Sequence, residues 1–342
     1  MIMALTPSHS VHDDSADPFG ERPIHGFSVQ KHILGGRFRF DSNSQALLQL
    51  VEAAYGELPQ QQLPMTTQEF TIELRLLPRQ MSPRDLEPPR VQMQAGAGLI
   101  CGVMDVSNYV VLAPAQRRAL VVASEDMLSH PYHLRYELIE FAVFTLAARG
   151  LGLVPLHGAC VGREGRGVLL LGGSGSGKST LALHSLLHGL DFLAEDAVFV
   201  HPESLLATGI ANYLHVQADA LRFIDEGDVR RWISQAPVIR RRSGVDKFEA
   251  DLRRGHGRLA ATPLKLVGAV FVSSQSADDP RELLQAIPAG DVVARLLADQ
   301  PYAAGQPGWR HFESQLVGQG IYELRRGTHP RASVDALLRL LN

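Results

Sequence analysis

The sequence predicts a mixed α/β protein in which a small α+β region precedes a larger α/β core. Strand-like and helical segments alternate between residues 150 and 200, an order typical of α/β cores. In the same stretch, a glycine-rich segment lies between a run of aliphatic residues and an amphipathic helical pattern. Residues 27–125 mix short strand patterns with one helix and carry no recognisable catalytic motif.

Composition limits the class of protein. The chain has 342 residues, of which 45% are hydrophobic and 20% charged, so it can build a core and is not disordered throughout. A net charge of −3 argues against a dedicated nucleic-acid binder. Two cysteines, Cys101 and Cys160, are too few for a disulfide framework. Without a signal-peptide pattern or an apolar run of about 18 residues, we expect a cytoplasmic protein that does not cross a membrane.

Changes in pattern divide the chain into three parts. Residues 1–26 are rich in Ser, His, Asp and Pro without periodicity, which predicts a disordered tail. Residues 27–130 are expected to form the N-terminal α+β domain, which would serve in substrate recognition or assembly. Residues 131–342 are expected to form a second, larger domain that contains the glycine-rich segment.

Local signals place the elements of the N-terminal part. FSVQKHILGGRFRF alternates apolar and polar residues and predicts a hairpin that turns at Gly35-Gly36. The helical pattern SQALLQLVEAAYG follows, with Ser42 or Ser44 as its cap. FTIELRLL predicts a strand, QMSPRDLEPPR a polar loop, and the stretch up to residue 125 three further strands.

The larger part begins with a long apolar helix, PYHLRYELIEFAVFTLAARG, for which Gly150 is the expected C-cap. Next come a strand in VPLHGACV, the turn GREGRG, a strand in VLLL, a helix in STLALHSLL and a strand in DFLA. LVGAVFV and IYELRR predict later strands, and DVVARLLADQ and ASVDALLRLL predict helices.

The glycine-rich segment fits the phosphate-binding pattern G-x-x-x-x-G-K-[ST]. Its glycines would turn the backbone so that several N–H groups face an anion, next to the positive end of a helix. Lys178 would reach the β- and γ-phosphates and Ser179 would ligate Mg²⁺, so we expect ATP and Mg²⁺ as cofactors. The predicted binding residues are Gly172, Gly173, Ser174, Gly175, Ser176, Gly177, Lys178, Ser179 and Thr180.

Two further features lie close to this motif. Glu195-Asp196 comes 17 residues after Lys178 and follows a predicted strand, so one carboxylate could hold Mg²⁺ and the other accept a proton. The alternative is a solvated turn. His157 lies on a strand that GREGRG would fold back against the motif's own strand, which would bring the imidazole near the phosphates.

The basic residues Arg240, Arg241 and Arg242, with Lys247, allow two interpretations. They form either a solvated charged loop or a mobile clamp that supplies positive charge to the triphosphate.

The ordered set of HGA, a short turn, G-x-x-x-x-G-K-S, a helix and an acidic pair resembles the HPr kinase/phosphorylase family. That family's kinase core is related to phosphoenolpyruvate carboxykinases. GGRFRFDSNSQALLQLVEAAYG looks like the HPr-kinase-related serine kinases of peptide-modification gene clusters, including lasso-peptide pathways. The resemblance implies that Lys178 and Ser179 bind phosphates and Mg²⁺. It further implies that Asp196 is the general base, that Glu195 assists at the metal and that His157 lines the phosphoryl site.

This sequence departs from the family pattern at three points. Thr180 stands where the bifunctional members have Glu, and Glu195-Asp196 replaces Asp-Asp. The stretch TGIANYLHV stands where the family has its second signature, a Leu-Glu-x-Arg-Gly-like stretch associated with dephosphorylation. We therefore expect a kinase that phosphorylates a hydroxyl of a peptide or small protein, with serine as the expected acceptor. A small-molecule kinase and a nucleotide-binding regulator with slow hydrolysis remain alternatives. Family relatives are often hexamers, so the resemblance also implies a homo-oligomer.

Overall fold

A computed structural model describes residues 26–79, 87–279 and 282–342. The predicted tail over residues 1–26 lies, except for Gly26, outside the described residues, as does part of the predicted loop QMSPRDLEPPR. The described chain contains helices and several β-sheets, so the prediction of a mixed α/β protein is confirmed. Among the described helices, none is both long and apolar enough to cross a membrane.

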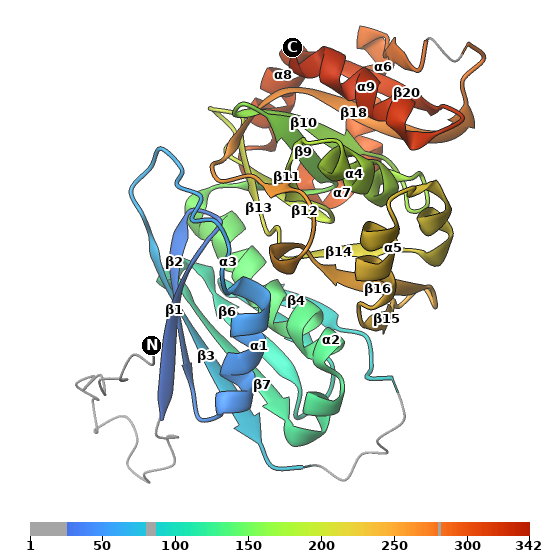
Figure 1. Cartoon of the computed structure of the whole chain (residues 1–342). Helices are drawn as coiled ribbons and strands as arrows, with labels where there is room; N and C mark the ends of the chain where they lie inside the picture. Colours follow the sequence, from blue (N-terminus) through green and yellow to red (C-terminus); the bar gives the residue numbers. More distant parts are fainter. Residues whose placement is uncertain (1–25, 80–86, 280–281) are drawn as a thin grey trace, which may run out of the picture.

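A seven-stranded sheet occupies the N-terminal part of the chain, at the lower left of Figure 1. The predicted hairpin is present and turns at Leu34-Gly35, where both residues have positive φ. The sheet has the order β1-β2-β3-β7-β6-β5-β4, and four strands rather than three follow β3. Its strands are β1 Phe27–Ile33, β2 Gly36–Ser42, β3 Glu69–Leu77, β4 Gln92–Gly96, β5 Leu99–Val103, β6 Tyr109–Ala113 and β7 Arg118–Ser124.

Two helices cover this sheet. The first, α1 (Gln45–Tyr55), has Ser44 at its N-cap position, but the Ser44 side chain makes no capping hydrogen bond. The second is one continuous helix made of α2 (Pro131–His133), a π-helical segment η4 (Leu134–Ile139) and α3 (Glu140–Leu151).

The end of the long helix differs from the expectation at Gly150. Gly152 is the C-cap, because its φ of 64° is the left-handed conformation that glycine adopts at low cost. Apolar residues of η4 and α3 share one hydrophobic core with the seven-stranded sheet. The division of the chain into domains at 130/131 stays a prediction.

The remaining part is built on a ten-stranded sheet, in the upper half of Figure 1. Its main path is β17-β11-β9-β10-β18-β13-β12-β8, and β19 and β20 extend it beside β18. The strands are β8 Val154–His157, β9 Ala159–Arg163, β10 Arg166–Leu171, β11 Asp191–Ala194, β12 Ala197–Val200, β13 Leu206–Gly209, β17 Arg258–Leu259, β18 Leu264–Ser276, β19 Leu284–Ala286 and β20 Ile321–Arg326.

Helices cover both faces of this sheet. Along β10, Val168 and Leu170 belong to the core shared with α4 and α9, whereas Leu169 and Leu171 belong to the core shared with α6 and α8. This alternation is the ordinary consequence of the two-residue repeat of a strand. The helices are α4 Lys178–Leu187, α5 Gly227–Ser234, α6 Ala289–Asp299, α7 Pro301–Ala304, α8 Trp309–Gln319 and α9 Pro330–Leu341.

A small three-stranded sheet lies between these two larger ones in Figure 1. Its order is β14-β16-β15, with β14 Tyr213–Val216, β15 Val238–Arg240 and β16 Asp246–Asp251. The β14–β16 register places His215 directly opposite Glu249.

Candidate functional site

The glycine-rich segment forms the loop between β10 and α4. Gly172, Gly175 and Gly177 all have positive φ, which L side chains rarely adopt. Gly172 also lies so close to β18 that a Cβ there would come within 2.8 Å of the Val272 carbonyl oxygen. The Lys178 side chain folds back over the loop and donates hydrogen bonds to the carbonyls of Gly172 and Gly173. Burial lowers the pKa of this lysine from its ordinary value.

The loop lines a cavity of about 800 Å³, a size typical of small-molecule sites. Every residue from Gly173 to Thr180 faces it, together with His157 and Asp196. Two aspartates, Asp196 and Asp219, line the cavity against seven cationic side chains, so its field favours anions. The cations are Lys178, Arg222, Arg241, Arg242, Lys247, Arg325 and Arg326.

Strands that meet end to end bring the acidic pair to this cavity. β9 pairs with β11 and β8 pairs with β12, so the two ladders join where Gly158 donates its N–H to the Asp196 carbonyl at 3.2 Å. A Cβ at Gly158 would come within 2.6 Å of the Leu170 carbonyl oxygen, so this crossing requires glycine. Asp196 faces the cavity, whereas Glu195 is 4% exposed and lies outside the cavity lining. The solvated-turn interpretation is therefore wrong for Glu195.

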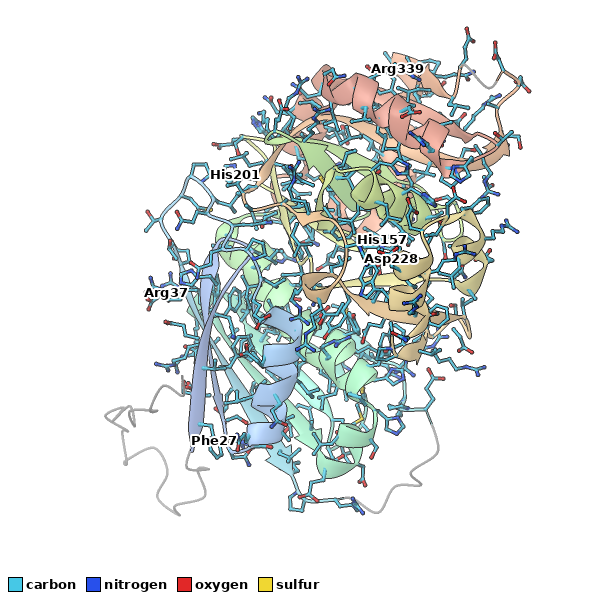
Figure 2. All side chains as sticks on the ribbon, in the orientation of Figure 1. Phe27, Arg37, His157, His201, Asp228 and Arg339 are labelled. Atoms are coloured by element: carbon cyan, nitrogen blue, oxygen red, sulfur yellow. The ribbon has the colours of Figure 1, made fainter. Side chains whose placement is uncertain are left out.

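His157 reaches the cavity by a route that differs from the expectation. VPLHGACV is two strands divided at Gly158, and only the second, β9, pairs with β10. His157 ends β8 and pairs with Ala197 of β12. Its Nδ1 lies 3.1 Å from the Asp196 carbonyl oxygen, and its backbone N–H donates to Gln300. In Figure 2, His157 lies near the middle of the molecule.

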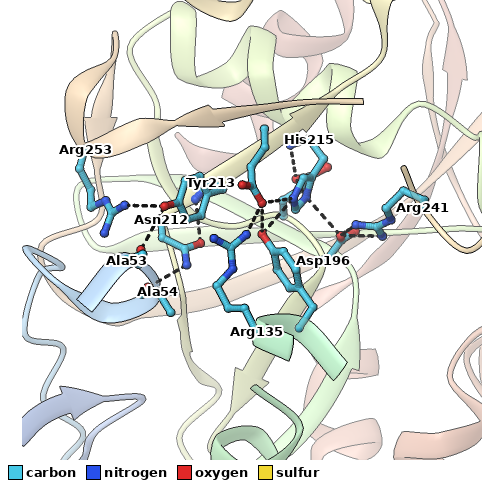
Figure 3. A network of polar contacts seen from close by, with 12 residues as sticks. Ala53, Ala54, Arg135, Asp196, Asn212, Tyr213, His215, Arg241 and Arg253 are labelled. Atoms are coloured by element: carbon cyan, nitrogen blue, oxygen red, sulfur yellow. Dashed lines mark hydrogen bonds and ion pairs between the residues drawn. The ribbon is translucent and has the colours of Figure 1, made fainter. Parts of the chain in front are cut away.

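Asp196 is held by charged neighbours (Figure 3). Both terminal nitrogens of Arg241 donate to its Oδ2 at 3.0 Å, and His215 Nδ1 lies 3.7 Å from the same oxygen. Burial by itself would raise the pKa of the Asp196 carboxyl, but the contact with His215 and the charge of Arg241 outweigh it and hold that pKa well below its usual range. In this arrangement Asp196 is ionised and a weak base.

The basic run does not form one solvated loop. Arg240 is exposed on β15, whereas Arg241 binds Asp196. Arg242 binds Glu137 of the long helix at 2.6 Å. Lys247 lines the cavity and makes no ion pair with any described residue. The clamp interpretation remains a prediction for Arg241 and Lys247.

Four functional candidates were not predicted from the sequence: His215, Glu249, Arg135 and Tyr136. His215 Nδ1 lies 3.2 Å from Glu195 Oε2, and the three carboxylates around this imidazole raise its pKa to about 10 although burial opposes the shift. Tyr136 donates to Glu249 at 2.9 Å, and Arg135 forms a buried ion pair with the same carboxylate. These residues come from three segments of the chain, so no local motif contains them.

Comparisons with known proteins find only a distant likeness. No protein-family model matches this chain, and no curated protein matches it. Among solved structures, the Hpr(Ser) kinase/phosphatase from Coxiella burnetii is similar over 54% of this chain and 90% of that chain, with 14% identity and a TM-score of 0.27. The resemblance to the HPr kinase/phosphorylase family stays a prediction.

Proposed function

We propose that this chain is an ATP- and Mg²⁺-dependent kinase that transfers the γ-phosphoryl group to a hydroxyl, most often of serine, in a peptide or small protein. One observation carries the proposal. A strand–loop–helix with the phosphate-binding pattern lines the same cavity as a carboxylate, an imidazole and an excess of cations. This combination provides an anion site and a base within one enclosure.

The loop and Lys178 would bind the triphosphate. Lys178 now donates to the loop's own carbonyls, so its ammonium is already held over the loop that the phosphates would occupy. The N-terminus of α4 begins at Lys178 and adds the positive end of its dipole. Arg241 and Lys247, which come from the β15–β16 hairpin of the small sheet, would add positive charge to the cavity.

Transfer requires a base at the acceptor hydroxyl. In the proposed step, the acceptor oxygen forms a bond to the γ-phosphorus while the bond from this phosphorus to the β–γ bridging oxygen breaks. ADP carries away the bridging oxygen, and the hydroxyl proton passes to a carboxylate oxygen of Asp196. Because Arg241 weakens Asp196 as a base, Arg241 must leave Asp196 Oδ2 before the proton moves. The triphosphate is the competing anion that would draw it away.

The acidic pair suits a divalent cation. Glu195 Oε1 is buried without a hydrogen-bond partner among the described residues, and binding of an ion would provide that partner. Ser179 lines the cavity and, with Glu195, would hold Mg²⁺. When bound, Mg²⁺ neutralises and orients the phosphate oxygens.

Calorimetry with ATP and Mg²⁺ tests the proposal. Removing a charged hydrogen-bond donor costs about 1.5–3 kcal/mol, so Lys178→Ala should weaken ATP binding about 10- to 150-fold. Lys265→Ala is the matched control, because Lys265 lies on β18 outside the cavity and bonds to the Ser204 carbonyl. Phosphate incorporation into a library of serine-containing peptides separates a kinase from a nucleotide-binding regulator. Equal ATP affinity in Lys178→Ala and in the wild type would refute the phosphate site.

A further inference from the structure

Three potential ligand atoms converge at the wall of the cavity. Glu195, Asp196 and His215 each offer one oxygen or nitrogen, and these atoms all lie within 4.8 Å of one another. Within this group, His215 Nδ1 lies 3.2 Å from Glu195 Oε2. The first two residues follow β11, whereas His215 comes from β14 of the small sheet.

Two of these side chains are buried and incompletely bonded. Glu195 and His215 are each 4% exposed. Glu195 Oε1 and His215 Nδ1 make no hydrogen bond of normal geometry with any described residue. A buried polar atom without a partner is costly and rare in folded proteins, and a missing ion is one of its ordinary explanations. Both atoms belong to the same converging group.

The other side of the imidazole is held as in a metal-binding histidine. His215 Nε2 lies 3.0 Å from the Tyr136 hydroxyl oxygen and 3.5 Å from Glu249 Oε1. Because Tyr136 donates its own proton to Glu249, its oxygen can accept the hydrogen on His215 Nε2. With that hydrogen on Nε2, an incoming ion would displace the proton from Nδ1, and the Nδ1 lone pair would then face Glu195 and Asp196. Metal-bound histidines commonly show this arrangement, with the second ring nitrogen fixed by a carboxylate or hydroxyl network.

We propose that Glu195, Asp196 and His215 form a three-ligand site for a divalent ion and that the imidazole nitrogen makes this site prefer Mn²⁺ over Mg²⁺. Mg²⁺ binds oxygen ligands and keeps its water, whereas imidazole suits transition metals. The inference deepens the proposed function, on which it rests, by adding His215 and one carboxylate oxygen of Asp196 to the ligands and by naming the preferred ion. The other oxygen of Asp196 would remain for the acceptor proton.

One of the proposed ligand oxygens, on Asp196, already accepts hydrogen bonds from Arg241. Arg241 donates to Asp196 Oδ2 at 3.0 Å through two nitrogens. The ion and the guanidinium therefore compete for this carboxylate. Arg241→Gln removes the competing charge, so this variant should bind Mn²⁺ more tightly than the wild type.

Electron paramagnetic resonance of Mn²⁺ with the full chain, without nucleotide, tests the site. Nitrogen hyperfine coupling in the wild type would show an imidazole ligand directly, whatever the folding of any variant. Glu249→Gln keeps all three ligands, and its affinity for Mn²⁺ should fall about 10- to 100-fold. His215→Gln removes a ligand, so its affinity for Mn²⁺ should fall further. His256→Gln is the matched control, because His256 lies beside Asp228 at 3.8 Å on the surface and should change nothing.

The possible results divide clearly. Absence of nitrogen coupling, or displacement of Mn²⁺ by an equal concentration of Mg²⁺, would overturn the proposal. His215-dependent Mn²⁺ binding in a chain that fails to bind ATP would support the metal site and refute the kinase. ATP binding lost in Lys178→Ala but without His215-dependent Mn²⁺ binding would support the kinase and refute this metal site.

Discussion

Replacing Asp196 by asparagine tests the chemical step itself. Asparagine keeps the shape and much of the hydrogen-bonding capacity of the side chain but removes its charge and basicity. A positioned general base contributes about 10²–10⁴ in rate, which is about 3–5 kcal/mol of activation free energy. We expect phosphate incorporation to fall by that factor in Asp196→Asn.

The same change should leave ATP affinity nearly intact. Asp196 is about one-third exposed, and its ion pair with Arg241 is of the partly solvated kind, which is worth about 1 kcal/mol or less. Breaking it releases Arg241 as an additional cation in the cavity. The affinity for ATP should therefore stay within about fivefold of the wild type, with any change toward tighter binding.

Mass spectrometry of phosphate incorporation, run beside calorimetry, measures both quantities. Asp219→Asn is the matched control, because Asp219 lines the same cavity, whereas the ion pairs of Arg241 and His215 are formed with other carboxylates. Near-normal transfer by Asp196→Asn would show that the base lies elsewhere. If transfer and ATP affinity fall together, Asp196 acts in nucleotide binding and not as a base. If Glu195→Gln is inactive while Asp196→Asn is active, the two roles are reversed.

Two further predictions concern stability. Burial raises the pKa of Glu140 on α3 from 4.5 to about 8. The folded state therefore favours the neutral carboxyl, and the free energy of unfolding should fall as the pH rises from the ordinary pKa of this group through 8. We compare the free energy of unfolding in urea of Glu140→Gln with that of the wild type. The difference should shift in favour of the variant by roughly 2–4 kcal/mol from pH 5 to pH 9, and a difference that does not change with pH would contradict the assignment. A chain truncated to residues 131–342 should aggregate, because it exposes Leu138, Val143 and Leu146, which the seven-stranded sheet buries. A folded, ATP-binding product in circular dichroism and calorimetry would instead support a domain boundary at 130/131.

Local sequence signals predicted the elements that depend on neighbouring residues. The hairpin over FSVQKHILGGRFRF and the strand–loop–helix around Lys178 are present because glycine conformation, aliphatic runs and helical periodicity act within a few residues. The change of strand partner at Gly158 gave no such signal. VPLHGACV has the apolar pattern of one strand. In the structure its first half, β8, pairs with β12 and its second half, β9, pairs with β10, so the segment is divided by its tertiary pairing. The sequence predicted His157 near the loop because its strand was expected to pair with the motif's own strand, β10. That pairing is made by β9, the strand that follows His157.

The inner part of the candidate site could not be predicted because it depends on pairing between distant segments. His215 meets Glu249 through the antiparallel register of β14 and β16, and both meet Tyr136 from a helix much earlier in the chain. A histidine inside YLHV has the ordinary pattern of a strand residue. Its chemistry is apparent only when three carboxylates surround it.

The long helix connects the N-terminal sheet to this site. Its π-helical segment contains Arg135, Tyr136 and Glu137, and each of these consecutive residues bonds to the other part of the chain. Such i→i+5 segments are rare and are frequently found at functional sites. The same helix is packed by apolar residues against the seven-stranded sheet. Contacts of this helix therefore link the core of that sheet to Glu249 and Arg242, and through Glu249 to the imidazole that faces Glu195 and Asp196.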